Sequence, residues 1–336
     1  MPNFAPVQLC NAVWCNVQCG RCEDQGGPRR QSGTGDKYRE QEKRRPMMKS
    51  AAYKTGDRDD RAAVLVPFAR SHLEGALKLS QEMSWPYRLE DWDVALQLGQ
   101  GFVLERAGKV IGTAAWWPYG ETHASAGMII VAKTAQGRGY GARLMDALLT
   151  SARPRTIALN STAEGQALYQ RRGFVPIGVI HQHQGIPRGR HESPPGLVRP
   201  MAASDFEAIM RLDRDATGLE RRQMLEKLLQ SGDGYVLQRD GMSRGYAISR
   251  LFGRGHVIGP VVAETATDAQ ALIEAALARL GSVFVRIDTS ATSQLGDWLE
   301  GIGLEQVGDA TTMILGTPAP SGGPARVFAI PNQSFG

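Results

Sequence analysis

The chain has 336 residues, an apolar fraction of 42% and a formal net charge of +5. This length suits two domains of ordinary size, and the apolar content allows each of them a buried core. No basic stripe with interleaved aromatic residues indicates a nucleic-acid partner, and no apolar run approaches the roughly 18 residues of a membrane span. Because the N-terminus also lacks the features of a secretion signal, we expect a cytoplasmic protein with neither nucleic acid nor membrane as its partner.

Residues 1–60 carry no periodic apolar pattern, and a polar, charged run extends over residues 25–45. Such a composition is typical of a disordered extension. All four cysteines lie within the first 22 residues, spaced as C-x4-C-x3-C-x2-C. This spacing lacks the paired C-x2-C units of structural metal sites, so we predict that the protein holds no metal.

Beyond the extension, the apolar pattern alternates between the strand period and the helix period. A strand starting at Val64 leads into a helix with apolar Leu73, Ala76 and Leu77. Further strands are predicted over residues 101–106, 109–117, 127–131 and 156–160, with helices after residue 141 and over 166–171. This order predicts the α/β class: a mixed, mostly antiparallel sheet with helices on both faces.

The second half of the chain repeats this plan. Leu197-Val-Arg-Pro resembles the start at Val64-Leu-Val-Pro, and the ending Leu168-Tyr169-x3-Gly173-Phe174 is echoed by Trp298-Leu299-x3-Gly303-Leu304. An internal duplication explains both matches. We therefore predict a first domain over residues 61–180, a linker over 181–196, a second domain over 197–316 and a flexible tail over 317–336.

The stretch 127–141, which reads GMIIVAKTAQGRGYG, joins an apolar strand to an amphipathic helix through a glycine-rich loop. Main-chain amides at a helix N-terminus form a site for anions, above all for phosphate. Gly137, Gly139 and Gly141 lack a Cβ atom, which lets the chain take a positive φ and lets a pyrophosphate come close to the main chain. The loop therefore predicts a phosphate-containing ligand.

Three nucleotide-binding patterns compete for this loop. A Walker loop needs Lys and then Ser or Thr after its last glycine, whereas Ala142 and Arg143 follow here. The dinucleotide fingerprint is met in its relaxed form by Gly137, Gly139 and Ala142. However, polar residues 133–136 separate these glycines from the strand, and the usual downstream carboxylate is missing. A dehydrogenase therefore ranks second.

The third pattern fits both the loop and the sequence after it. The run from Val131 to Gly141 resembles the acyl-CoA loop of the GNAT acetyltransferase superfamily, and the run from Ile157 to Phe174 resembles the next strand, helix and Gly-Phe turn of that family. The resemblance covers roughly residues 64–179. The two-domain organisation is similar to that of tandem GNAT proteins.

The resemblance implies an N-acetyltransferase that moves an acetyl group directly from acetyl-CoA to an amine. Main chain of Ile129, Ile130 and Val131 would run beside the pantetheine. Tyr169 would protonate the departing thiolate, and its phenol is suited to this because it is neutral at physiological pH. Further contacts with CoA are implied for Gln136, Gly137, Arg138, Gly139, Tyr140, Gly141 and Asn160.

The acceptor is expected to be the amine of a small molecule, in a pocket shaped by Trp85, Tyr87 and Trp117. Acetylation of a protein N-terminus or lysine, and a CoA-binding sensor without catalysis, stay open as alternatives. The acyl chain length and the oligomeric state are also open. The base that deprotonates the amine is equally undetermined among Glu82, Glu90, Asp91, Glu121 and His123.

The second copy has lost the features of the loop. After Val262 the sequence reads Ala-Glu-Thr-Ala-Thr-Asp, with no glycine and two acids that would repel a pyrophosphate. Leu299 stands where the first copy has Tyr169. We therefore predict a degenerate, non-catalytic second domain. Other polar residues are interpreted as solvated or structural: His181, His183 and His191 in the linker, and Asp213, Asp215 and Arg221 as a helix-end network that could instead reach a polar acceptor.

Overall fold

A computed structural model describes residues 63–192 and 196–336. The predicted N-terminal extension and its four cysteines lie outside these residues, as do residues 193–195 of the predicted linker. Among the described residues, none of the helices has the length and apolar character that a membrane span needs.

The first copy contains strands and helices in the predicted order. Its elements are β1 (Val64–Pro67), η1 (Arg70–His72), α1 (Leu73–Glu82), α2 (Leu89–Leu98), β2 (Gln100–Arg106), β3 (Lys109–Tyr119), β4 (His123–Val131), η2 (Lys133–Ala135), α3 (Tyr140–Ala152), β5 (Thr156–Ser161), α4 (Gln166–Gln170) and β6 (Val175–Gly185).

The second copy repeats this series without a counterpart of η2 and adds one strand, β13. Its elements are β7 (Val198–Pro200), η3 (Ala203–Asp205), α5 (Phe206–Thr217), α6 (Arg222–Leu229), β8 (Gly232–Arg239), β9 (Met242–Phe252), β10 (Gly255–Ala263), α7 (Ala266–Leu280), β11 (Val285–Ser290), α8 (Gly296–Gly301), β12 (Glu305–Leu315) and β13 (Arg326–Ile330).

Local sequence explains the elements that the two copies share. The β2–β3 turn at Ala107-Gly108 and the β8–β9 turn at Asp240-Gly241 both have positive φ at their two residues, as a two-residue hairpin requires. In α3 the buried residues Leu144, Met145, Leu148 and Ala152 recur every three or four positions, so one face of the helix packs on the sheet.

The thirteen strands that the described residues form belong to one sheet, in the order β1-β2-β3-β4-β5-β12-β6-β11-β13-β10-β9-β8-β7. Among the pairs that the described residues form, only β4–β5 and β10–β11 are parallel. The predicted fold class, a mixed and mostly antiparallel sheet with helices, is therefore confirmed.

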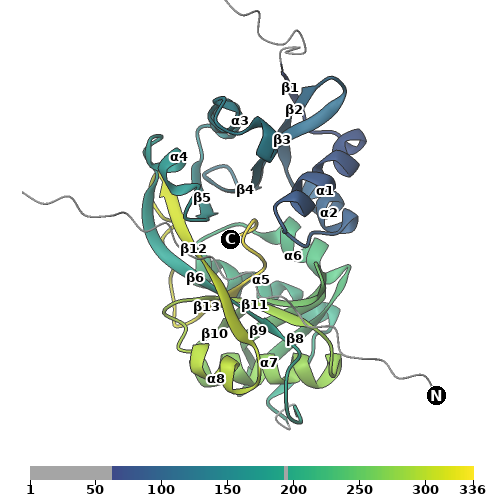
Figure 1. Ribbon diagram of the computed structural model, residues 1–336. Helices are drawn as coiled ribbons and strands as arrows, with labels where there is room; N and C mark the ends of the chain where they lie inside the picture. The colour runs from purple at the N-terminus through teal and green to yellow at the C-terminus, as the bar shows by residue number, and fades with distance from the viewer. Residues whose placement is uncertain (1–62, 193–195) are drawn as a thin grey trace, which may run out of the picture. The chain divides into compact units, whose positions relative to one another are not determined.

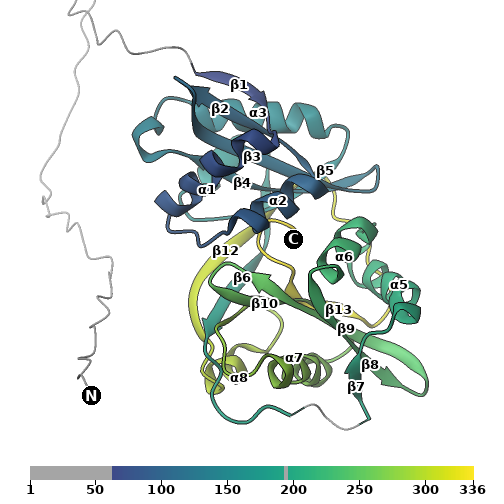
Figure 2. The same ribbon diagram turned by 90° about the vertical axis from the view of Figure 1, so that its right-hand side faces the viewer.

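The two copies exchange their last strands (Figures 1 and 2). Strand β12 of the second copy lies antiparallel beside β5 of the first, from Thr311↔Ser161 to Leu315↔Ile157. Strand β6 of the first copy pairs with β11 of the second, from Val285↔Gly185 to Ser290↔Ile180. The copies are therefore joined by main-chain ladders as well as by side-chain packing.

The prediction of a flexible tail over 317–336 is wrong. Residues 326–330 form β13, whose Phe328, Ala329 and Ile330 are buried. These apolar residues have to be covered, and a strand position inside the second copy's sheet covers them while satisfying their main-chain groups.

Strand β13 fills the gap between the two parallel strands of the second copy. Strands β10 and β11 pair directly only at His256↔Val285 and Val257↔Arg286. Beyond that point they separate, and β13 pairs antiparallel with both of them, through Ala329↔Val261 on one side and Ile330↔Asp288 on the other.

The predicted linker over 181–196 also needs correction, because β6 continues to Gly185. The interpretation of its histidines as solvated is wrong for His183, which is fully buried in that strand, and burial lowers its pKa. His191 is half-buried and contacts Glu274 at 2.7 Å. His181 and His183 alternate with polar residues, so the sequence here does not show the apolar pattern of a buried strand. The strand is nevertheless covered on the face that carries His183.

If β13 is an integral strand, Phe328→Ala should destabilise the protein strongly. The ring is fully buried in the second core, and such a truncation costs about 3–5 kcal/mol. The half-buried neighbour, Val327→Ala, is the matched control and should cost less. Denaturant unfolding of both variants measures the loss in the free energy of unfolding. Small and equal losses in the two variants would contradict a buried β13.

Candidate active site

The glycine-rich loop of the first copy forms an uncapped helix N-terminus. Gly137 and Gly139 have φ of 76° and 78°, and α3 begins at the next residue, Tyr140, without a side-chain cap. No described atom lies within 4 Å of the positions that Cβ atoms would take on these two glycines. The first amides of α3 are therefore open to an anion, at a point where the helix dipole favours negative charge.

Strand β4 leaves its parallel neighbour before it reaches this loop. The β4–β5 register ends at Ala126↔Leu159, and β4 is irregular just beyond, where Met128 has a φ of 51° and its carbonyl accepts from the Thr113 hydroxyl at 2.7 Å. Within the described register, main chain of residues 129–131 has no strand partner on the β5 side. These groups can bind an extended ligand as an added strand would.

Helix α4 is tied to the start of α3. Arg172, just after α4, donates to Asp146 at 2.8 Å and to the Ala142 carbonyl at 3.0 Å. Tyr169 is 7% exposed and meets Phe174 edge to face, with ring centroids 5.9 Å apart. Burial raises the pKa of Tyr169 to about 12, so its phenol stays protonated and able to donate.

A cavity of about 180 Å³ opens where β4 and β5 separate. Gly127 of β4 and Asn160 of β5 line it. Predicted pocket residues Trp85 and Tyr87 form part of its wall, between α1 and α2. The remaining lining comes from both copies: Ser84, Pro86, Met128, Thr162, Gln182, Phe252, Arg286, Gln333 and Ser334.

Trp117 does not line this cavity. It is buried, its indole N–H donates to the Ala95 carbonyl at 2.8 Å, and its ring packs edge to face against Phe335 at 5.0 Å. Trp117 therefore belongs to the core of the first copy, in contact with Phe335. Trp116 and Trp117 are adjacent, and the sequence does not show which of the two rings faces a ligand.

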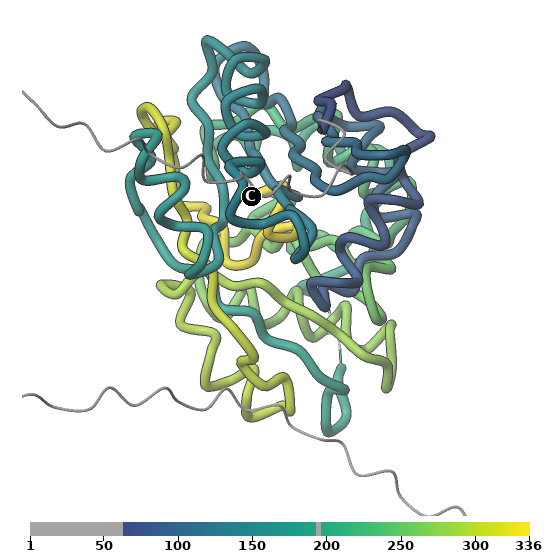
Figure 3. Tube along the Cα trace, turned by 45° about the horizontal axis from the view of Figure 1, so that its top comes forward, coloured from purple at the N-terminus to yellow at the C-terminus, as the bar shows by residue number. Residues whose placement is uncertain are grey.

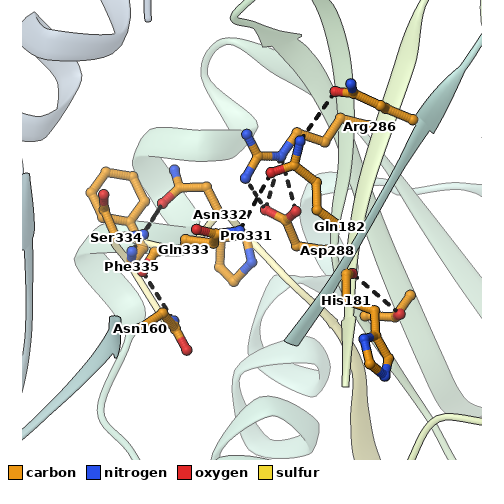
Figure 4. Close-up of polar contacts among 12 residues, drawn as sticks. Asn160, His181, Gln182, Arg286, Asp288, Pro331, Asn332, Gln333, Ser334 and Phe335 are labelled. Atoms are coloured by element: carbon orange, nitrogen blue, oxygen red, sulfur yellow. Dashed lines mark hydrogen bonds and ion pairs between the residues drawn. The ribbon is translucent and has the colours of Figure 1, made fainter. Parts of the chain in front are cut away.

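Asn160 lies at the cavity with both ends of its amide engaged. Its Nδ2 donates to the Gln333 carbonyl at 3.0 Å (Figure 4). Its Oδ1 accepts from the Thr312 hydroxyl at 2.7 Å. Both partners come from the second half of the chain. The contact with CoA expected for this residue stays a prediction, and the side chain has a structural role in addition.

Arg286 brings a buried charge to the cavity. Burial alone would lower its pKa, but the paired carboxylate of Asp288, at 2.8 Å, raises it overall. Nearby, burial lowers the pKa of Arg250 to about 10 despite the opposing effect of Asp91. The sequence could not point to Arg286 or Phe252, because they lie in the copy that lacks the glycine loop and carry no motif.

None of the five candidate bases is among the described residues that line the cavity. Asp91 instead pairs with Arg88 at 2.9 Å and accepts the Gly253 amide at 3.0 Å. Glu121 contacts Arg155 at 3.3 Å. Asp91 and Glu121 thus have structural partners, and the ionisable side chains at the cavity are Tyr87 and Arg286.

The second copy has no corresponding cradle. Helix α7 follows β10 almost directly, and its N-terminus is capped by Thr265, whose side chain accepts from the Asp268 amide at 3.1 Å. The buried Asp268 carboxylate binds Arg239. Leu299 is fully buried where the first copy has Tyr169. The N-terminus of α7 is therefore not an open anion site, and β13 occupies the gap between β10 and β11 beside it.

Within the described residues, no group of three or more His, Cys, Asp or Glu side chains could hold a metal ion.

Both halves of the chain match models of the acetyltransferase (GNAT) domain, over residues 97–176 and 209–329. The chain therefore belongs to the GNAT family and carries two GNAT domains in tandem. This confirms the resemblance inferred from the loop and from the repeated ending.

Two relatives match nearly along their whole length. An uncharacterized N-acetyltransferase, YitH of Bacillus subtilis (strain 168), is 25% identical over 81% of this chain and 98% of its own. Holothin acyltransferase of Pseudoalteromonas sp. (strain SANK 73390) is 27% identical over 77% of this chain and 97% of its own. Together with the two family matches, these relatives identify the protein as an acyltransferase.

Solved structures share the fold. A Pyrococcus horikoshii protein superposes with a TM-score of 0.70 at 19% identity, over 82% of this chain and 96% of that one. A tandem GNAT protein from the clavulanic acid biosynthesis pathway gives 0.55 at 15% identity, over 78% and 100%.

The open cradle predicts a specific effect of a single methyl group. Gly139→Ala places a Cβ at the anion site, and acetyl-CoA affinity should fall on the order of tenfold or more. Gly108→Ala is the matched control, because its φ of 73° and open surroundings impose the same backbone strain away from the site. Calorimetric titration with acetyl-CoA measures both; equal affinities would contradict the assignment of the cradle.

The filled gap and capped helix of the second copy predict a stoichiometry of one. Calorimetric titration of the intact chain with acetyl-CoA should saturate at one molecule per chain, because a second would have to displace β13. A measured stoichiometry of two would show that the second copy still binds.

Proposed function

We propose that the protein transfers an acetyl group from acetyl-CoA to the amine of a small molecule, in the first copy and by direct transfer. The observation that carries this proposal is the succession of three features along β4 and the loop that follows it: the cavity at Gly127, the main chain of residues 129–131, which has no strand partner on the β5 side, and the open cradle at 137–139.

The chain's own groups have separate roles in this proposal. Amides of residues 136–141 hold the pyrophosphate, and main chain of residues 129–131 holds the pantetheine and polarises the acyl carbonyl. Acetyl-CoA supplies the acyl group as a thioester. The neutral amine nitrogen bonds to the carbonyl carbon while the carbon–sulfur bond breaks; the nitrogen loses a proton to water, and the thiolate gains one.

Tyr169 is the proposed donor of that last proton. It follows Leu168, which reaches within 3.6 Å of the Cβ position of Gly141, so α4 lies directly beside the cradle. Its raised pKa of about 12 keeps the proton available throughout the physiological range. Water then restores the phenol, which completes the proton balance.

The cavity favours a small acceptor over a protein. Its volume of about 180 Å³ and its walls from the α1–α2 segment, β9, β11 and residues 333–334 suit a compact molecule with an apolar or aromatic body. A protein N-terminus or lysine would need an open approach for the rest of its chain.

A two-stage experiment tests this function. Calorimetry first measures binding of acetyl-CoA, and thiol release is then followed with 2-phenylethylamine, phenylalanine, spermidine and a lysine-containing peptide. Turnover with a small amine supports the proposal, whereas turnover with the peptide alone favours a protein acceptor. Binding without any turnover would identify a sensor, and the absence of binding would refute the assignment.

Tyr169→Phe should reduce kcat by about 100-fold or more, because it removes the proton donor, with acetyl-CoA affinity unchanged. The control is Tyr235→Phe, which alters a buried tyrosine of the second copy. It should leave both kcat and the acetyl-CoA affinity unchanged. Since the pKa of Tyr169 is about 12, its ionisation should not lower kcat below about pH 11. Unchanged turnover of the Phe variant would remove Tyr169 from the mechanism.

A further inference from the structure

Residues 331–336 follow β13 and reach the active site of the other copy. From Ile330 in the second copy's sheet, the chain continues to the first copy, where Gln333 meets Asn160 of β5 (Figure 4). Figure 3 shows the trace of the segment to its end, marked C. Ser334 lies against Gly127 of β4, and Phe335 contacts Trp117 and Tyr119 of β3. These six residues, called here the 331–336 segment, belong to neither predicted domain.

The segment holds its own turn through one side chain. The Asn332 Oδ1 accepts the amide N–H groups of Ser334 and Phe335, at 2.8 and 2.9 Å. Asn332 is buried, so this pair of bonds forms out of contact with water. The conformation is therefore fixed locally before any contact with the first copy is counted.

The first copy holds the far end of the segment. The Phe335 ring packs on Trp117, and the Phe335 carbonyl accepts the hydroxyl of Tyr119. The Gly336 carbonyl accepts from Arg221 at 2.9 Å.

Arg221 is itself fixed by the buried carboxylate of Asp213, at 2.5 Å. Tyr246 donates to the same carboxylate at 2.5 Å. Anchors from both copies therefore make the segment part of the fold. Asp213 and Arg221 form a buried support. The Asp215 side chain is exposed.

Ser334 stands where the cavity meets the separating strands. Its hydroxyl is 3.0 Å from that of Tyr87, and a Cβ built on Gly127 would lie only 3.0 Å from the Ser334 Cα. Ser334 is 5% exposed and lines the cavity. The Ser334 hydroxyl has one donor site and two acceptor sites, and the contact with Tyr87 uses one of them.

We infer that the 331–336 segment is a fixed wall of the acceptor cavity and that Ser334, paired with Tyr87, positions the acceptor amine. The inference rests on the proposed function and assigns its acceptor side. A neutral primary amine can donate to one hydroxyl of the pair and accept from the other, which orients its nitrogen beside Gly127. The second copy thus contributes to the reaction of the first through β13 and the segment that follows it.

Ser334→Ala and Tyr87→Phe, made in the full chain, test this inference. With 2-phenylethylamine or phenylalanine as acceptor, each variant should raise the amine KM about five-fold, with acetyl-CoA affinity by calorimetry changed less than two-fold. The double variant should show less than the product of the two effects, because the hydroxyls bond to one another.

Ser249→Ala and Tyr235→Phe are matched controls, because their hydroxyls form a similar buried pair at 3.4 Å in the second copy, away from the cavity. They should leave the amine KM unchanged. Melting temperatures are measured for all four single variants. A variant with an unchanged melting temperature and a raised amine KM has lost the positioning of the amine and not its fold.

Two results would overturn the inference while leaving the proposed function intact: an unchanged amine KM in both cavity variants, or faster turnover in Ser334→Ala, as expected if the segment were a plug. If the unmodified protein acetylates no amine although it binds acetyl-CoA, the proposed function fails and this inference fails with it.

Discussion

In each copy two parallel strands start as neighbours and then separate. Their facing main-chain N–H and C=O groups then need other hydrogen-bond partners, and the rest of this structure depends on what supplies them. Both copies contain such a pair, β4–β5 and β10–β11. In the second copy β13 enters the gap and satisfies both strands. In the first copy the gap stays open beside a glycine cradle, so a ligand with an extended, amide-bearing arm and a phosphate group can take the place of the missing strand.

The exchange of β6 and β12 has a functional consequence. It makes one sheet of both copies, so the cavity at Gly127 receives Phe252 and Arg286 from strands of the second copy. Burial of Arg286 is tolerated because Asp288 pairs with it at 2.8 Å. The second copy lacks an open anion site of its own, yet it supplies part of the cavity wall. In the proposed function, one copy holds the acyl donor and both copies enclose the acceptor.

Predictions from sequence succeeded where local chemistry is decisive. The hairpin turns, the helix after Gly139 and the strand entering the loop follow from residues within a few positions of one another. Predictions failed where the partner is distant. Four apolar residues among prolines and glycines do not indicate a strand, so β13 has no clear local signal. Likewise, nothing in the local sequence distinguishes Trp117, which is buried in the core, from Trp85, which lines the cavity. Gln333 and Ser334 were missed for the same reason: their role comes from contacts with residues more than 150 positions earlier.

The sequence by itself determined the family, the duplication and the single cradle, because each depends on short motifs whose spacing and glycine content have direct conformational consequences. Tertiary structure alone decided which copy each last strand joins, what fills the second gap and which side chains enclose the acceptor. Strands β6 and β12 could pair with either copy as far as their residues show. Their pairing is fixed by the joint burial of both sheets, a property of the whole chain that no local pattern records.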